Sequence, residues 1–400
     1  MNRQEHCVRV GIFFDGTGNN QADPARAPSN IALLHRLYPQ GTVAGQVYFK
    51  VYMEGIGTTA GAADSLYAMA TGKGATGVLA RVEQALAAVA GQLRQGALPA
   101  RVEFDLFGFS RGAAAARHLA NRLSGNQGLP GELQGPCTIN FIGLFDTVAA
   151  IVEPLRGDFD PADARNGSLR LGLGEGIARQ VVQLVARDEQ RRNFALMRSG
   201  NDIVVPGVHA NIGGGYPAST REQVLLSKPG SSRVPQRVPA EKTQAYAQAQ
   251  ALLAELGEPG ARVLTWDVAL GDAWARRDAP EKQVYAAVYR EREVSGHLSR
   301  VYLSIMRELG LRGGVPFLPP GDDEAYRVPG ELQAISDQLH EQVLAGGRAL
   351  SAEQEAWLRE RYVHASAHWN ALKGVRSGAL EVLFVNRPAQ GGRVVHDNPV

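Results

Sequence analysis

The chain has 400 residues, of which 44% are hydrophobic and 20% are charged. This composition excludes collagen-like and wholly disordered proteins and is ordinary for a globular enzyme. The formal net charge is +2, from 42 Lys and Arg against 40 Asp and Glu, and the two signs are interspersed, so nucleic acid is not expected as a partner. The two cysteines, Cys7 and Cys137, indicate neither a disulfide framework nor a thiolate zinc site.

The amino end carries no readable secretory signal. The apolar run of residues 10–14 is short and meets Asp15 at once, unlike the apolar centre of a signal peptide. No window approaches the roughly 18 unbroken apolar residues of a membrane-spanning helix. We therefore expect a soluble protein, which would need a dedicated export machine to act outside the cell.

Strands and helices alternate in the first part of the chain. Such alternation predicts a mostly parallel sheet with crossover helices, and the fold class is therefore α/β. The apolar patterns predict strands at 8–14, 47–53, 102–107, 139–145 and 203–208, and helices at 78–93, 113–123 and 176–187.

The composition changes after residue 216. Residues 217–239 are rich in Ser, Pro, Arg, Lys and Gln, which indicates an inserted excursion, and helices are predicted at 242–256, 298–309 and 351–372. A late strand at 380–385 is expected to complete the sheet. These features predict a core at 1–216, an insertion or lid-like region at 217–296, and a helical cover with the last strand at 297–400.

The main catalytic candidate is Ser110, within a G-x-S-x-G pattern framed by Gly108 and Gly112. The pattern lies between a predicted strand and a helix of alanines, which is the context of a nucleophile elbow. The amide of Arg111, the next residue, would then be one donor to an oxyanion. A serine that only caps a crossover helix is the alternative, although such a cap does not need the second glycine.

A serine nucleophile needs a base and an acid, and in this fold the chain order is serine, acid, histidine. Asp146 ends the apolar strand at 139–145 and is the candidate acid; a turn or helix cap with Thr147 is the alternative. His209 follows the strand at 203–208 and opens a glycine-rich loop, so it is the candidate base, against a purely structural histidine. His364 is the second candidate base, with a packing role in a helix as its alternative.

The loop after the first strand is expected to lie beside the elbow. Backbone amides of Gly16 or Thr17 could supply the second oxyanion donor, with Asp15 near substrate or behind the loop, although a plain turn explains the same residues. His364 and His368 lie one helical turn apart, but no carboxylate at a suitable spacing supports a metal site. Neither a metal nor an organic cofactor is expected.

Together these motifs resemble the catalytic domain of the type VI secretion phospholipase effectors and their relatives. Looser matches continue through residues 188–192 and 306–311, so the resemblance extends to about residue 320. It rests on five blocks in the same order: Phe14-Asp15-Gly16-Thr17 with Asn19; Gly55-Ile56-Gly57-Thr58; Gly108-Phe109-Ser110-Arg111-Gly112-Ala113; Phe145-Asp146-Thr147-Val148; and Pro206-Gly207-Val208-His209 with Gly213-Gly214-Gly215-Tyr216.

The resemblance implies an α/β-hydrolase fold and a Ser-Asp-His triad, which falls on Ser110, Asp146 and His209. It also implies phospholipase A-type cleavage of carboxylic esters by an antibacterial effector. Such a protein is made in the bacterial cytoplasm and delivered to the periplasm of a target cell. Its expected partners are phospholipid, a membrane surface touched peripherally, a secretion spike protein and an immunity protein.

Two rival functions remain open. A soluble esterase or amidase would use the same residues on a small substrate, and a non-catalytic binding module would keep only the fold. The family's usual Asp two residues after the histidine is Asn211 here, so any role that needs a charge at that position is lost. Residues 217–261, with Lys228, Arg233, Arg237 and Lys242, are a candidate lid or interfacial patch, although a solvated excursion explains them more simply.

Overall fold

The computed structural model describes residues 7–21, 26–56, 77–95, 99–125, 129, 136–149, 162, 166–270, 280–373 and 386–399. Within these residues, seven strands form one sheet in the order β2-β3-β1-β4-β5-β6-β8. All neighbouring pairs are parallel except β2 with β3. The strands are β1 (Cys7–Phe14), β2 (Gly41–Val43), β3 (Gln46–Met53), β4 (Arg101–Phe109), β5 (Cys137–Phe145), β6 (Gln180–Ala186) and β8 (Asp202–Val205).

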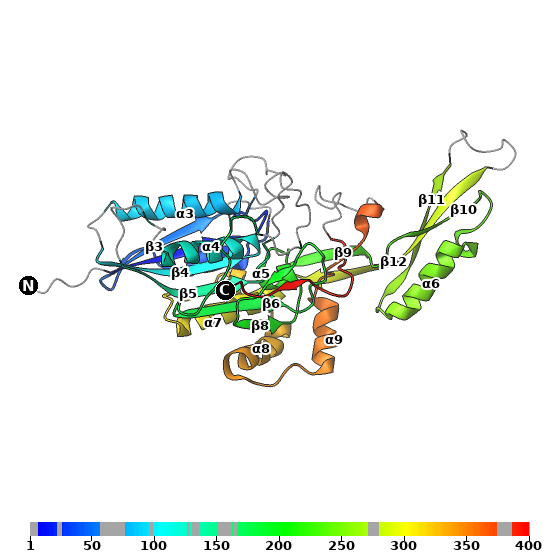
Figure 1. Cartoon of the computed structure of the whole chain (residues 1–400). Coiled ribbons are helices and arrows are strands. Elements are labelled where there is room, and N and C mark those ends of the chain that lie inside the picture. The colour runs from blue at the N-terminus through cyan, green and yellow to red at the C-terminus, as the bar shows by residue number, and fades with distance from the viewer. Residues whose placement is uncertain are drawn as a thin grey trace, which may run out of the picture.

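Helices cover both faces of this sheet (Figure 1). Successive side chains of β1 alternate between two cores, so Val10 and Ile12 face one layer of helices and Phe13 faces the other. The first layer consists of α3 (Val78–Leu93) and α4 (Arg111–Ser124). The second consists of α1 (Asn30–Leu37), α7 (Leu298–Arg312), α8 (Gln333–Ala345) and α9 (Ala352–Arg361). The fold is thus mixed α/β with a mainly parallel sheet between helices.

The predicted strands at 8–14, 47–53, 102–107 and 139–145 and the helix at 78–93 are confirmed. The helix predicted at 176–187 is wrong, because Gln180–Ala186 is the strand β6. Val181, Val182, Leu184 and Val185 form an apolar run that fits a helix as well as a strand covered on both faces. Paired with β5 on one side and β8 on the other, the run is a strand.

Two further boundaries differ from the prediction. The strand expected at 203–208 ends at Val205, and His209 already lies in the short helix α5 (His209–Gly213). The helix expected at 351–372 ends at Arg361, and His364 lies in the irregular segment after it. The strand predicted at 380–385 lies outside the described residues.

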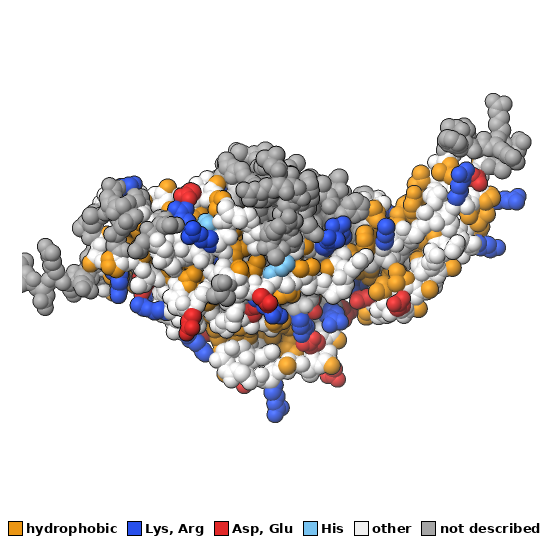
Figure 2. Space-filling view, in the orientation of Figure 1, with side chains coloured by type: hydrophobic (Ala, Val, Ile, Leu, Met, Phe, Trp, Pro, Cys, Tyr) orange, Lys and Arg blue, Asp and Glu red, His pale blue; other side chains and the backbone are white. Residues whose placement is uncertain are grey.

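An antiparallel sheet follows the parallel one and was not predicted. Its strands are β9 (Ser219–Leu225), β10 (Gly230–Pro235), β11 (Ala261–Ala269) and β12 (Glu281–Ser295), with β12 in the middle. We call residues 230–270 and 280–290 the arm, which also carries α6 (Gln244–Leu256) and extends away from the parallel sheet (Figure 1). Figure 2 shows hydrophobic and basic side chains next to one another on the arm.

The last described segment, residues 386–399, runs back across the body of the protein, and we call it the tail. Its strand β13 (Val395–His396) pairs with β7 (Leu196–Met197), which lies in the loop after β6. Backbone amides of Arg192, Leu196 and Arg198 donate to carbonyls of the tail. The tail therefore lies against the segment that links β6 to β8.

Candidate active site

Ser110 lies at a sharp turn between β4 and α4. Its φ of 59° and ψ of −126° place a residue other than glycine in a strained conformation, which costs about 1–3 kcal/mol. A Cβ at Gly108 would lie 2.5 Å from the Cα of Ala113, and a Cβ at Gly112 would lie 2.2 Å from the carbonyl oxygen of Phe14. Both glycines are therefore required sterically, as the nucleophile elbow reading predicts.

Ser110 is only 6% exposed, and its hydroxyl has no hydrogen-bond partner among the described residues. The preceding residue, Phe109, packs its ring against the imidazole of His209, with the ring centroids 4.6 Å apart. A Cβ at Gly213 would lie 2.1 Å from the same phenyl ring. The close packing of α5 against Phe109 thus brings His209 next to the elbow.

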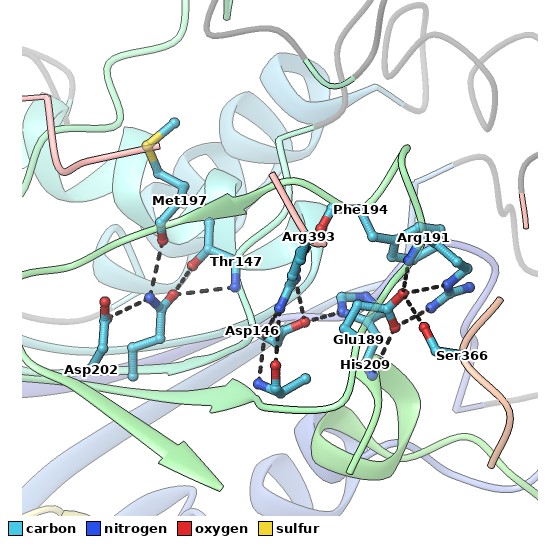
Figure 3. Close-up of polar contacts among 12 residues, drawn as sticks. Asp146, Thr147, Glu189, Arg191, Phe194, Met197, Asp202, His209, Ser366 and Arg393 are labelled. Carbon is cyan, nitrogen blue, oxygen red and sulfur yellow. Dashed lines mark hydrogen bonds and ion pairs between the residues drawn. The ribbon is translucent and has the colours of Figure 1, made fainter. Parts of the chain in front are cut away.

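Asp146 and His209 form a direct contact (Figure 3). Nδ1 of His209 lies 2.5 Å from Oδ2 of Asp146, and both side chains are buried. Asp146 follows β5 with a positive φ of 46°, and the amide of Ala186, at the end of β6, donates to its Oδ1 at 3.0 Å. The ends of two adjacent strands thus position the acid.

Arg393, a residue of the tail that the sequence analysis missed, also binds Asp146 (Figure 3). Its two terminal nitrogens each donate to one carboxylate oxygen at 2.8 Å. Burial raises the pKa of Asp146, but the charge of Arg393 and the hydrogen bonds from His209 and Arg393 outweigh it, so the pKa lies well below its ordinary value. No sequence pattern distinguishes this arginine from others in Gly-containing loops.

A second buried ion pair lies on the other side of His209. Glu189 accepts hydrogen bonds from Nε and a terminal nitrogen of Arg191, from the Ser366 hydroxyl and from the backbone amide of His209. Burial lowers the pKa of His209, and the hydrogen bond with Asp146 opposes this only in part, so the imidazole is neutral at pH 7. A neutral imidazole whose Nδ1 is bound to a carboxylate can accept a proton at Nε2.

The loop after β1 was expected to supply a second oxyanion donor from the amide of Gly16 or Thr17, and the structure matches this only in part. The amide of Gly16 donates to the carboxylate of Asp15 at 2.7 Å and so is already engaged. Ser29 and Tyr52 also donate to Asp15 through their hydroxyls, both at 2.6 Å, which makes Asp15 a support of the loop. Thr17 lies nearer the elbow, because Nε of Arg111 donates to its hydroxyl at 2.8 Å.

The amide of Arg111 belongs to the first residue of α4, directly after Ser110 and at the positive end of the helix dipole. It therefore fits the place of an oxyanion donor, as the sequence predicts. Burial lowers the pKa of the Arg111 guanidinium to about 10, which leaves the side chain charged at pH 7.

His364 does not contact Asp146 in the structure. Its Nδ1 lies 3.2 Å from Nδ2 of Asn211, and its ring stacks on Tyr216 with the centroids 3.6 Å apart. Asn211 also donates to the carbonyl of Tyr362 at 3.0 Å and accepts from the amide of His364. Asn211 thus anchors the segment after α9, and the structure pairs the acid with His209 rather than with His364.

No group of three or more His, Cys, Asp or Glu side chains is arranged to hold a metal ion within the described part of the chain. Cys7 and Cys137 are both free. Of the helices that the structure describes, none combines the length and the apolar character needed to cross a membrane.

The fold and the site thus define a class: an α/β protein with a strained serine turn and a buried Asp-His pair at the carboxyl edge of a parallel sheet. A family model described as the catalytic domain of Tle1-like phospholipase effectors of the type VI secretion system matches residues 9–132. The resemblance to these effectors is therefore confirmed.

A structure of the Tle1 effector bound to the VgrG spike of the type 6 secretion system shares 27% identity at a TM-score of 0.76, over 91% of this chain and 85% of that one. An uncharacterised protein from Pseudomonas aeruginosa shares 18% identity over 97% of this chain and 57% of that one, at a TM-score of 0.42, which is too low to establish a shared fold. No curated protein matches the sequence.

Proposed function

We propose that this chain is a serine hydrolase of the α/β-hydrolase type that cleaves carboxylic esters of phospholipids, as a phospholipase A. The observation that carries the proposal is the buried contact of 2.5 Å between His209 and Asp146, packed against a strained serine turn. The likeness to Tle1-like phospholipase effectors supports the substrate class.

In this mechanism neutral His209 takes the proton from the Ser110 hydroxyl as the oxygen attacks the ester carbonyl. Asp146 holds the imidazole in the correct tautomer and stabilises its charged form. The oxyanion accepts hydrogen bonds from the amide of Arg111 and from a second amide, for which Thr17 is the candidate. Water then hydrolyses the acyl-enzyme with His209 again acting as the base.

We also propose that the protein is an antibacterial effector, delivered by type VI secretion to the periplasm of a target cell. The spike-bound state of the similar Tle1 structure supports a spike protein as a partner of this chain. The division of the chain at residues 216 and 296 remains a prediction. So do the immunity protein as a partner and the role of residues 217–261 as a lid. Within the candidate basic patch, Arg233 already donates to Glu281 at 2.6 Å.

The decisive experiment measures fatty acid released from phospholipid vesicles by the wild type and by Ser110→Ala. Loss of a nucleophile of this kind lowers kcat by about 10⁶-fold. Ser124→Ala is the matched control, because Ser124 lies at the other end of α4 and donates only to the carbonyl of Ala120. Release by the wild type and the control alone supports the proposal, whereas equal release by Ser110→Ala contradicts the assignment of the nucleophile.

A second measurement separates the rival functions. A fluorophosphonate reacts with an activated serine, so labelling that is lost in Ser110→Ala indicates a hydrolase even without lipid turnover. Labelling with turnover of soluble esters and none of vesicles would indicate a soluble esterase. Absence of both labelling and turnover would indicate a binding module.

A further inference from the structure

The tail provides Asp146 with an ion pair that a serine-acid-histidine mechanism does not require. Asp146 is fully buried and already has one strong donor in His209 and another in the amide of Ala186. Arg393 adds two parallel hydrogen bonds, one to each carboxylate oxygen, in the bidentate geometry that only arginine provides. Both oxygens are thereby fixed in place.

The guanidinium is itself held tightly. Its Nε donates to the carbonyl of Phe194 at 2.7 Å, and the side chain is 8% exposed. The backbone around it is fixed where Leu196 donates to the carbonyl of Val394 and Arg198 donates to that of His396. The rings of Phe194 and His209 in turn form a T-shaped pair, with the centroids 4.9 Å apart. Arg393 and its partners thus contact the acid directly and the base through Phe194.

We propose that Arg393 is a positioning residue for the Asp146–His209 pair, so that the tail sets both the orientation of the acid and the pH at which the pair works. This inference rests on the proposed function, because it assigns a role within the same site. It identifies residues 386–399 as part of the active site rather than as a separate surface element.

The charges around the pair determine the expected direction of the pH effect. Arg393 faces Asp146 from the tail, and Glu189 and Arg191 face His209 from the loop after β6. Without Arg393, the full charge of Asp146 attracts the imidazolium more strongly, and burial favours protonated Asp146. Both changes let the pair bind a proton at higher pH, and a protonated pair cannot accept the proton of Ser110.

The test compares Arg393→Gln and Arg393→Lys with wild type. The acid limb of kcat/KM is measured on a p-nitrophenyl ester of a short fatty acid between about pH 5 and pH 9. We expect the limb to move to higher pH by roughly one unit in Arg393→Gln, and by less in Arg393→Lys, which keeps the charge but not the bidentate geometry. If Arg393→Gln does not fold, the pH of the acid limb in Arg393→Lys is compared with that of wild type instead.

Asn398→Ala is the matched control for loosening the tail. Asn398 exchanges hydrogen bonds with the backbone of Leu173 and accepts one from Arg117, without touching Asp146. An acid limb that stays in place in Arg393→Gln overturns the proposal. An equal shift of the acid limb in Asn398→Ala also overturns it, because the packing of the tail, and not the guanidinium, would then determine the pH of the limb.

A second readout does not depend on turnover. The titration of the His209 ring is followed by NMR in protein with ¹⁵N-labelled histidine, and the resonance is assigned through His209→Gln. A higher titration midpoint in Arg393→Gln than in wild type supports the positioning role even if no ester is cleaved, in which case only the proposed function fails. An unchanged midpoint overturns the positioning role whether or not the protein is active.

Discussion

Nδ1 of His209 and Oδ2 of Asp146 lie 2.5 Å apart although 63 residues separate them in the chain. The contact arises because β5 and β8 both pair with β6, so that Asp146 and α5 follow strands that end at the same edge of the sheet. Both residues are buried. A hydrogen bond in such surroundings is stronger than the same bond in water.

Replacing Asp146 with Asn tests this contact. We expect kcat to fall on the order of 10⁴-fold, because an amide at this position favours the wrong tautomer of the imidazole. The variant should also lose about 3–5 kcal/mol of unfolding free energy, since Arg393 then stays buried without its carboxylate. Ester turnover and chemical denaturation measure the two effects.

Adding Arg393→Gln to Asp146→Asn should recover part of the lost stability but none of the lost activity. Asp202→Asn is the control, because Asp202 accepts from Gln183 and Ser199 at the far end of β8. Turnover in Asp146→Asn comparable to that of Asp202→Asn would contradict the assignment of the acid.

Two glycine substitutions should change stability in opposite directions. At Gly112 an added methyl group would lie 2.2 Å from a backbone oxygen of Phe14, so Gly112→Ala should lose about 3 kcal/mol or more. Gly91 lies within α3 with open space around it, so Gly91→Ala should gain about 0.5–1 kcal/mol. Denaturant unfolding of the two variants gives both values, and a neutral Gly112→Ala would show that the elbow can relax.

The ion pair between Glu189 and Arg191 is expected to stabilise the loop that packs against His209. Glu189→Gln should cost about 3–5 kcal/mol, because Glu189 is buried and Arg191, whose side chain is only 13% exposed, loses its counter-charge. The double change Glu189→Leu with Arg191→Met should cost less than the single one, since it removes both charges. A double variant less stable than Glu189→Gln would refute this account of the pair.

Asn211→Asp should destabilise the protein in a pH-dependent way. At about pH 8 the new carboxylate cannot donate to the carbonyl of Tyr362 or to Nδ1 of His364, and the lost hydrogen bonds cost about 1–3 kcal/mol. Near pH 5.5 protonated His364 donates to the carboxylate, so the loss should be smaller. Unfolding free energies of variant and wild type at the two pH values measure this difference.

The pKa of His364 determines whether the stability loss in Asn211→Asp grows or shrinks with pH. In the wild type, burial lowers the pKa of His364 to about 4, although the charge of Glu222 opposes the change. The neutral ring therefore contributes its full stabilisation above about pH 6.5. This contribution to the folding stability is lost as the pH falls. In Asn211→Asp the folded-state pKa rises above that of the unfolded chain. The new pair therefore stabilises below about pH 6.5 and is lost as the pH rises through the folded value. A loss independent of pH would show that His364 stays neutral in the variant.

The sequence predicted the parallel strands and the strand-turn-helix around Ser110 because both leave local patterns. The steric demands at Gly108 and Gly112 come from neighbours close in the chain or from the adjacent strand, and a G-x-S-x-G motif encodes them. Strand β6 was predicted as a helix because its apolar residues do not alternate. Its identity depends on pairing with β5 and β8, which only the fold determines.

The candidate site was predicted only in part, because some of its residues follow local patterns and others do not. Asp146 and His209 follow apolar strands in the order that a hydrolase requires, and the structure brings the two together, although their chemical roles stay predictions. Arg393 lies 247 residues from Asp146 in a segment without periodic apolar residues. Nothing local to the sequence reveals such a contact.

The tail is synthesised after the strands of the parallel sheet, because it follows them in the chain. A chain is made from its amino end, and the earlier parts fold first. Asp146 and His209 leave the ribosome well before Arg393 does, so the nascent protein at first lacks the guanidinium that binds the acid. A nonsense codon between residues 214 and 392 would leave all seven described strands of the parallel sheet encoded, but not this partner of Asp146.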